Sequence, residues 1–320
     1  MYFVRPFFLF LLLAVYLLCV ALTFVQPHQI DYSGHLALFE FCILLAVACC
    51  CLRLVARRCE AAGARLATAL RIPAGLFELA ALVIASNVTL RTMDYLSKGT
   101  SMPLADDWLS KVGPMLGFSW LGYFDLVRNA PNLQLLMEKA YNLLNSAMLI
   151  FLVLLVLSRQ HDKVRTFTEA AIICSLVSLV GGALFPAIGA AAFWVPDYAN
   201  PETWAGYTGM PGVYFVEEIR AVRQLDTPML VGSKHLTGLV TFPSLHTALA
   251  VLMILVARRT WIFWPALAYG IVMIAATPIW GGHYLADLIS GTVMATCVVL
   301  IIERFPSQRR HPPGKALAAA

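Results

Sequence analysis

Charged side chains are scarce in this sequence of 320 residues: 13% are Asp, Glu, Lys or Arg, whereas 60% are hydrophobic. A soluble globular protein has about 25% charged residues, so this chain has too few to cover a surface that faces water. The mean hydropathy of +0.76 agrees with this. The net charge of +5 does not indicate nucleic-acid binding, because the basic residues lie between apolar segments and form no single patch. The composition therefore excludes a soluble protein and predicts one that crosses a membrane several times.

The predicted outer loops lack cysteine, although the chain contains eight. All eight fall within apolar segments or at their inner ends, so no disulfide framework is predicted. Cys49, Cys50 and Cys51, near the inner boundary, are open to two interpretations, acylation or packing as small apolar side chains. The sequence also lacks an HExxH pattern and a cluster of three or four metal ligands, which argues against a metal site.

The apolar residues fall into segments of about 20 residues, the length at which a helix crosses a bilayer core of roughly 30 Å. We therefore predict an all-α, polytopic membrane helix bundle with about eight spans. The predicted spans are residues 7–24, 36–55, 73–92, 141–157, 169–188, 242–257, 261–279 and 283–302. We interpret the first as an anchor and not as a cleaved signal peptide, because its apolar run is too long and no small-residue cleavage site follows it.

The distribution of Lys and Arg predicts the orientation. The two short outer loops, around Pro27 and Gly281, contain neither residue, and short loops determine how a membrane protein is inserted. We therefore predict that both termini are cytoplasmic. Two long outer loops, residues 93–140 and 189–241, are expected to fold over the outer face. The first reads as an interfacial amphipathic helix, and the second as an aromatic lid or rim or as an aromatic belt at the headgroups.

The first reactive candidate is His246, at the outer start of the sixth predicted span. Residues 243–246 read Pro-Ser-Leu-His, and proline in a first helical turn costs no backbone hydrogen bond. Ser244 and the free amide groups around it would lie at a helix N-terminus, which attracts anions. We expect a phosphate bound there to be within reach of His246.

The second candidate pair is His283 and Asp287, which lie four residues apart on one face of the eighth span. The carboxylate can hold one imidazole nitrogen and leave the other free for attack. An aspartate inside an apolar span is costly, which favours a functional role. The sixth and seventh spans form a hairpin, so His246 and His283 return to the same membrane face. Such a group suits phosphoryl transfer, and Gly282 would permit a backbone or a substrate to approach closely.

The segments Pro-Ser-x-His at 243–246 and Gly-His-Tyr-x-x-Asp at 282–287 resemble those of the type 2 phosphatidic acid phosphatase superfamily. Within that superfamily they are most similar to the inositol phosphorylceramide synthase branch and its bacterial relatives. The resemblance implies a six-helix core over residues 73–302. Two N-terminal transmembrane helices and a basic cytoplasmic loop, residues 1–72, would precede it, and a disordered cytoplasmic tail, 303–320, would follow.

The same resemblance implies a role for each site residue. His283 would be the nucleophile that forms a phosphohistidine, Asp287 would orient it, His246 would protonate the leaving oxygen, and Ser244 would bind the phosphate. Gly282 is a further candidate for phosphate binding. No metal and no other cofactor would be required.

The sequence departs from the phosphatase branch in its positive charges. That branch has an arginine six residues before the nucleophilic histidine, where this chain has Thr277, and its upstream K-x6-R-P segment is absent. Because a phosphoryl group needs positive or donor groups around it, we predict that Arg220, Arg223 and Lys234 take over this role. Alternatively they are solvated loop charges paired with neighbouring glutamates.

Together these features predict an integral membrane lipid phosphatase or phosphotransferase acting at the outer face. Its substrate would be a phospholipid, an isoprenoid phosphate or a sphingolipid phosphate, and its acceptor water or a lipid or polyol hydroxyl. The alternative is a non-catalytic transporter or scaffold with the same fold; a haloperoxidase is disfavoured because that group is typically soluble. The polar residues within the spans would line a headgroup pocket or a proton path, or they would form hydrogen bonds between helices. They are Glu40, Glu78, Asn87, Asn142 and Asn145.

Overall fold

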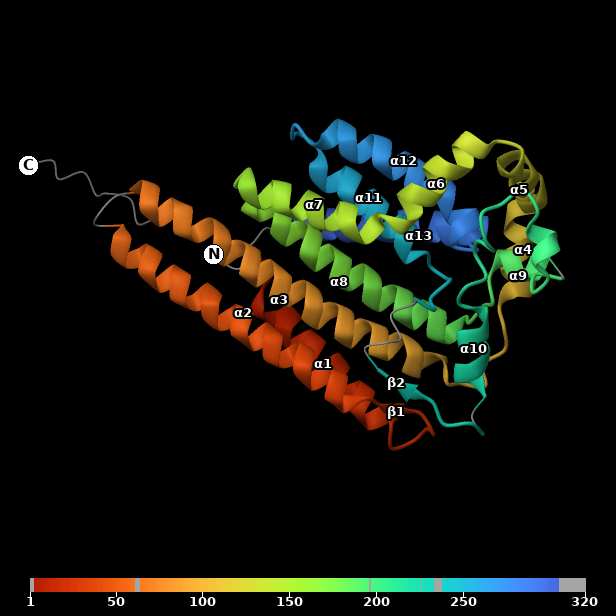
Figure 1. Cartoon of the computed structure of the whole chain (residues 1–320), viewed down its shortest axis with the longest axis horizontal. Helices are drawn as coiled ribbons and strands as arrows, with labels where there is room; N and C mark the ends of the chain where they lie inside the picture. Colours follow the sequence, from red (N-terminus) through yellow and green to blue (C-terminus); the bar gives the residue numbers. More distant parts are fainter. Residues whose placement is uncertain (1–2, 61–63, 196, 225, 233–237, 305–320) are drawn as a thin grey trace, which may run out of the picture.

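The computed structural model describes residues 3–60, 64–195, 197–224, 226–232 and 238–304, and it is a helix bundle capped at one end (Figure 1). The long helices are α1 (Pro6–Leu22), α2 (Tyr32–Cys59), α3 (Ala64–Lys98), α7 (Leu144–Leu157), α8 (His161–Leu184), α11 (Leu245–Ala257), α12 (Phe263–Trp280) and α13 (Leu285–Arg304). The shorter elements are β1 (Gln29–Ile30), α4 (Asp106–Met115), α5 (Trp120–Arg128), α6 (Pro131–Asn142), α9 (Ala190–Trp194), η1 (Pro201–Trp204), α10 (Val216–Arg223) and β2 (Leu230–Val231).

Each of the eight predicted spans corresponds to a helix, which confirms the all-α membrane bundle. Five described helices, α2, α3, α8, α12 and α13, are long and apolar enough to cross a membrane, and α6 with α7 makes up to six. The remaining two, α1 and α11, are apolar helices of 17 and 13 residues. At about 1.5 Å per residue, α11 is shorter than the bilayer core.

The fourth predicted span differs from the structure, because it is the second half of a bent pair. Helix α6 begins at Pro131, and the chain turns by 61° before α7. At the bend the carbonyl of Ala140 accepts a hydrogen bond of 2.8 Å from the Tyr269 hydroxyl of α12. The bend directs Tyr141, the next residue, into the interior of the bundle, where it is buried.

Several charges within the apolar helices are paired at the end opposite the cap. Glu169 of α8 is 1% exposed and binds the guanidinium of Arg5 at 2.6 Å. Glu78 of α3 binds Arg53 and accepts a hydrogen bond of 2.6 Å from the backbone amide of Phe3. A buried carboxylate is costly unless it is paired, so these contacts explain why α1 and α2 pack against α3 and α8. Of the predicted tail, residues 303–320, the first two belong to α13, and the rest lie outside the described residues.

The two long outer loops form a cap of short helices at one end of the bundle (Figure 1). The single amphipathic helix expected in the first loop is divided into α4 and α5, because Gly117 has a φ of +77° and Ser119 caps a new helix. Trp204 of the second loop is 2% exposed and packs edge-on against Phe124, and the Tyr207 hydroxyl donates to the Phe124 carbonyl at 2.7 Å. These aromatic residues join the two loops.

The N-terminal hairpin is joined to the same cap. Strand β1 pairs in parallel with β2, with Gln29 opposite Leu230. The imidazole of His28 is fully buried, and its Nε2 lies 2.7 Å from the carbonyl of Val222 in α10. The connection between α1 and α2 is thereby fixed to the segment that leads into α11.

Candidate active site

The start of α11 and the start of α13 meet beneath the cap, as the predicted hairpin of α11 and α12 requires. Ser244 is the N-cap of α11, and its Oγ accepts a hydrogen bond of 3.3 Å from the amide of Thr247. The Ser244 amide donates to the backbone carbonyl of Asp287 at 3.1 Å. Capping explains why a serine begins this helix, and the second bond fixes its position relative to α13.

His283 lies between Asp287 and Ser244. Its Nδ1 is 3.1 Å from Asp287 Oδ2, and its Nε2 is 3.3 Å from Ser244 Oγ. The same carboxylate oxygen accepts the amide of Tyr284 at 2.9 Å. A carboxylate can only accept, so with Asp287 ionised Nδ1 is the donor and the lone pair on Nε2 faces the serine hydroxyl. His283 is 2% exposed and the other two side chains are fully buried, so the three form a closed, oriented group.

His246 lies beside this group but is only partly buried. Its ring centroid is 6.1 Å from that of His283, with the rings inclined by 61°. On its other side it stacks on Tyr141 at 4.8 Å, and the Tyr141 hydroxyl is 3.0 Å from that of Tyr214. Sequence analysis did not identify Tyr141, because a tyrosine at a span boundary is the ordinary pattern of a headgroup belt.

Glycines allow the backbone around His283 to pack tightly. Gly282 has a φ of +61°, and a Cβ there would lie 2.3 Å from the carbonyl oxygen of Gly212. Gly212 has a φ of +75°, and its own Cβ would lie 2.3 Å from the Ile279 carbonyl. The close approach that Gly282 was expected to permit is thus made by the second outer loop, and the Gly282 carbonyl accepts the Ala190 amide at 2.6 Å.

Asp106 of α4 is a further buried group next to the site. Its carboxylate accepts the amides of Ile188 at 3.1 Å and Gly189 at 3.0 Å, and the hydroxyl of Tyr284 at 2.7 Å. Burial raises the pKa of the Asp106 carboxyl. It also raises the pKa of the hydroxyl of Tyr284, which directly follows His283 in the sequence. Asp106 was not predicted, because an aspartate in a first helical turn is common for dipole reasons alone.

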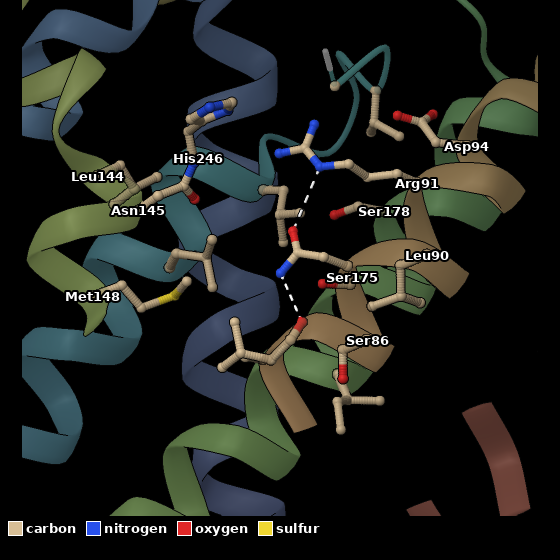
Figure 2. A pocket seen from close by; sticks show the side chains of 18 of the residues that line it. Ser86, Leu90, Arg91, Asp94, Leu144, Asn145, Met148, Ser175, Ser178 and His246 are labelled. Carbon is tan, nitrogen blue, oxygen red and sulfur yellow. Dashed lines mark hydrogen bonds between the residues drawn. The ribbon is translucent and has the colours of Figure 1, made fainter. Parts of the chain in front are cut away.

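A cavity of about 610 Å³ extends from His246 into the bundle. Figure 2 shows α3 on one side of it, with Leu90 and Arg91, and α7 on the other, with Asn145 and Met148. Residues of α8 and α11 also line it. Asn87, Asn142 and Asn145 line this cavity.

Of the predicted phosphate-binding cations, Arg220 and Arg223 do not line this cavity. Arg220 is exposed and pairs with Glu217 at 3.1 Å. Arg223 donates a hydrogen bond of 2.6 Å to the Met102 carbonyl. Lys234 lies outside the described residues. The buried hydroxyl of Thr277 donates to the Met273 carbonyl of its own helix at 2.8 Å, so this position supplies no charge.

Within the described residues, Arg91 of α3 lines the cavity that His246 also lines. Sequence analysis did not single out Arg91, because it reads as an ordinary basic residue at the end of a span. No group of three His, Cys, Asp or Glu side chains in the described ranges is placed to hold a metal ion.

A family model described as the PAP2 superfamily matches residues 107–301, more than half of the chain. The match includes the start of α11, the start of α13, the second long loop and the first long loop from residue 107 onward, whereas α1, α2 and α3 precede it. Neither a curated protein nor a solved structure matches the chain. The match agrees with the resemblance of the two histidine segments. The chain therefore belongs to the PAP2 superfamily, which generally comprises phosphatases and phosphotransferases.

Proposed function

We propose that this protein is an integral membrane lipid phosphatase or phosphotransferase that works through a phosphohistidine at His283. The observation that carries the proposal is the series of contacts from Asp287 through His283 to Ser244, at 3.1 and 3.3 Å, with His246 alongside. It fixes one imidazole nitrogen as a hydrogen-bond donor and leaves the other as a nucleophile.

In the first step Nε2 of His283 attacks the phosphorus of the lipid phosphoester. A nitrogen–phosphorus bond forms, the bond from phosphorus to the alcohol oxygen breaks, and the electron pair stays on that oxygen. His246, protonated at the start, gives the oxygen its proton. Asp287 stabilises the positive charge on the His283 ring through Nδ1, and Ser244 together with the free amides at the start of α11 binds the phosphoryl oxygens.

In the second step a water molecule or an alcohol attacks the phosphohistidine. Neutral His246 accepts the proton of the attacking hydroxyl, the nitrogen–phosphorus bond breaks, and its electron pair returns to Nε2. Water gives free phosphate, whereas a lipid or polyol hydroxyl gives a new phosphoester. Both outcomes use the same protein groups, so the acceptor that reaches the intermediate decides between them.

A second mechanism has a specific observation in its favour. The contacts from Ser244 to His283 to Asp287 are also those of a serine nucleophile with a histidine base and an orienting aspartate. In that case the phosphoryl group would be carried on Ser244 Oγ. We favour His283 because Ser244 Oγ already caps α11 through the Thr247 amide, and the superfamily resemblance implies a phosphohistidine.

Within the superfamily, we propose that this chain is related to the inositol phosphorylceramide synthase branch. Thr277 supports it, because the cation that the phosphatase branch carries at this position is missing and the threonine bonds to its own helix. This relationship favours transfer to a hydroxyl over hydrolysis.

Purified protein in lipid nanodiscs, given a lipid with ³²P in its phosphoester, tests the proposal. We expect free phosphate in buffer alone and labelled product when ceramide or inositol acceptors are added, with neither product from the His283→Ala chain. Turnover that survives this substitution would overturn the proposal. A transporter or scaffold would form no labelled product under any condition.

We also propose that the active site faces the outside of the membrane, with both termini in the cytoplasm. The absence of Lys and Arg from the short outer loops supports this. In a chain without native cysteines, Glu202→Cys in the cap should react with an impermeant maleimide in intact cells, whereas Arg58→Cys at the end of α2 should not. The reverse pattern would place the site in the cytoplasm.

A further inference from the structure

The cavity beside His246 has a polar end and an apolar end. Arg91 and the carboxylate of Asp94 lie toward the polar end, and Arg91 faces the side from which His246 projects (Figure 2). Asn87, which accepts a hydrogen bond from Arg91, also lines the cavity. Leu82, Val83 and Met148 extend the lining with apolar side chains. A volume of about 610 Å³ is within the usual range for sites that enclose a small ligand. The shape and chemistry match an amphiphile with an anionic group at one end.

The charge of Arg91 is poorly satisfied by the protein. Within the described residues, its one hydrogen bond joins Nε to Asn87 Oδ1 at 3.5 Å, the limit for such a bond, and no carboxylate pairs with it. The nearest acid on its own helix, Asp94, instead accepts the Leu239 amide at 2.7 Å and pairs with Lys98 at 3.6 Å. A half-buried guanidinium whose other donors have no partner among the described residues is suited to a phosphate, which it binds through two parallel hydrogen bonds.

The position of the cavity also indicates which part of a substrate occupies it. His246 lines the cavity, whereas His283, Ser244 and Asp287 do not. His246 gives its proton to the leaving alcohol in the mechanism above, so the alcohol lies on the side of His246 and the phosphorus lies between the two histidines. The alcohol part of a lipid therefore extends from His246 into the cavity.

Exposure indicates where the lipid enters. Asn87 of α3 and Asn145 of α7 are exposed although both line the cavity within apolar helices. The cavity is therefore open at the surface between α3 and α7, and an amphiphile can enter from the bilayer.

We propose that the cavity between α3 and α7 holds the apolar chain of a lipid phosphoester and that Arg91 binds its phosphate. The mechanistic part rests on the proposed function. Arg91 takes the place of the arginine that is missing at Thr277, and it comes from a helix that precedes the matched segment. It is a substrate-binding residue, and the cavity selects lipids over soluble phosphate esters.

Binding tests this independently of turnover. Full-length protein carrying His283→Ala is purified in nanodiscs, and its affinity for radiolabelled dipalmitoyl phosphatidic acid is measured. We expect Arg91→Gln to weaken binding by about 10- to 100-fold, the usual effect of losing charge-assisted hydrogen bonds, and Arg91→Lys to weaken it less. Lys111→Gln, an equal loss of charge on the exposed side of α4, should leave binding unchanged. Equal affinity of the Arg91→Gln and parent chains would overturn the assignment.

Two further ligands separate a lipid site from a free phosphate site. Neutral dipalmitoylglycerol should bind as weakly to the parent chain as phosphatidic acid binds to Arg91→Gln, and glycerol 3-phosphate should compete poorly. Strong competition by inorganic phosphate or glycerol 3-phosphate would show that Arg91 binds soluble phosphate and that the cavity does not select for lipid.

A variant that fills the cavity tests the apolar part. Ser175→Phe on α8 places a ring in the cavity, and we expect it to reduce the affinity for phosphatidic acid at least tenfold. Val177→Phe, on the same helix at a 43% exposed position outside the lining, is the matched control. Leu90→Trp on α3 repeats the test should Ser175→Phe not fold. Unchanged affinity in a folded filled variant contradicts the proposal.

These results are distinguishable from a failure of the proposed function. Binding to the His283→Ala chain requires no chemistry, so a wild-type protein that forms no phosphohistidine would remove the mechanism and leave the lipid site standing. Conversely, a phosphohistidine in the wild-type protein, together with unchanged lipid affinity in the Arg91→Gln and Ser175→Phe chains, would remove the lipid site and leave the mechanism standing.

Discussion

The histidine group and the cavity beside it are built in contrasting ways. Ser244, His283 and Asp287 are almost completely buried, and glycine contacts hold their backbones together. The cavity instead is lined by exposed asparagines, and its arginine has few partners in the described part of the chain. If the proposed function holds, the difference means that the chemical step and the selection of substrate depend on separate surfaces, which meet at His246. The first lies within the family match, and α3 brings Arg91 to the second from outside it.

The largest expected effect is on turnover, and it should leave lipid binding unchanged. His283→Ala should reduce turnover by at least about 10⁴-fold, as the loss of a nucleophile does, yet leave lipid binding intact. Steady-state turnover and equilibrium binding on the same preparation measure both. A His283→Ala chain that also fails to bind lipid would mean that the two surfaces are one.

The next largest effect follows from the orientation of the His283 ring by Asp287. Asp287→Asn should lower turnover by about 10²- to 10⁴-fold, because an amide at this position favours the wrong imidazole tautomer and does not stabilise the charged ring. KM for the lipid should change little, since Asp287 does not line the cavity. A change confined to KM would contradict the orienting role.

The close backbone contact at the histidine group predicts a large loss of stability. Gly282→Ala should destabilise the fold by about 2–4 kcal/mol, because it combines a left-handed conformation with a clash against Gly212. Gly209→Ala is the matched control: its φ is +74° and nothing lies within 4 Å of its Cβ. We expect it to cost about 1–2 kcal/mol, from conformation alone. Unfolding measured in detergent should show the difference, and equal losses would mean that the contact with Gly212 is unimportant.

The smallest expected effect is that of losing the hydrogen bond between Tyr284 and Asp106, next to His283. Tyr284→Phe removes the hydroxyl that donates to the buried carboxylate of Asp106, and we expect a loss of about 1–3 kcal/mol in stability. Turnover should fall only modestly, because the ring, which packs against Phe193, and the backbone amide that donates to Asp287 both remain. Tyr269→Phe, which removes a hydroxyl at the α6–α7 bend, provides the comparison. A greater loss of activity from Tyr269→Phe would place the more sensitive contact at the bend.

The sequence was sufficient to predict the bundle and the histidine group, because both depend on local patterns. Apolar segment length predicted the helices, the i, i+4 spacing predicted the contact of His283 with Asp287, and the α11–α12 hairpin brought Ser244 to them. Asp106 and Tyr141 were not predicted, since each reaches the histidine segments through contacts between distant parts of the chain. Arg91 was not predicted for the same reason, because only the folded bundle brings it to the cavity that His246 lines. Arg220 and Arg223 were nearer in sequence to the site, yet α10 directs them elsewhere.

The chemical stability of the phosphorylated intermediate tests the central claim most directly. Wild-type protein is mixed with the ³²P-labelled lipid, quenched by denaturation, divided between acid and alkali, and digested to locate the label. We predict a label that acid releases and alkali does not, on the peptide that contains His283. An acid-stable label on the peptide that contains Ser244 would contradict the account and establish the serine as the nucleophile.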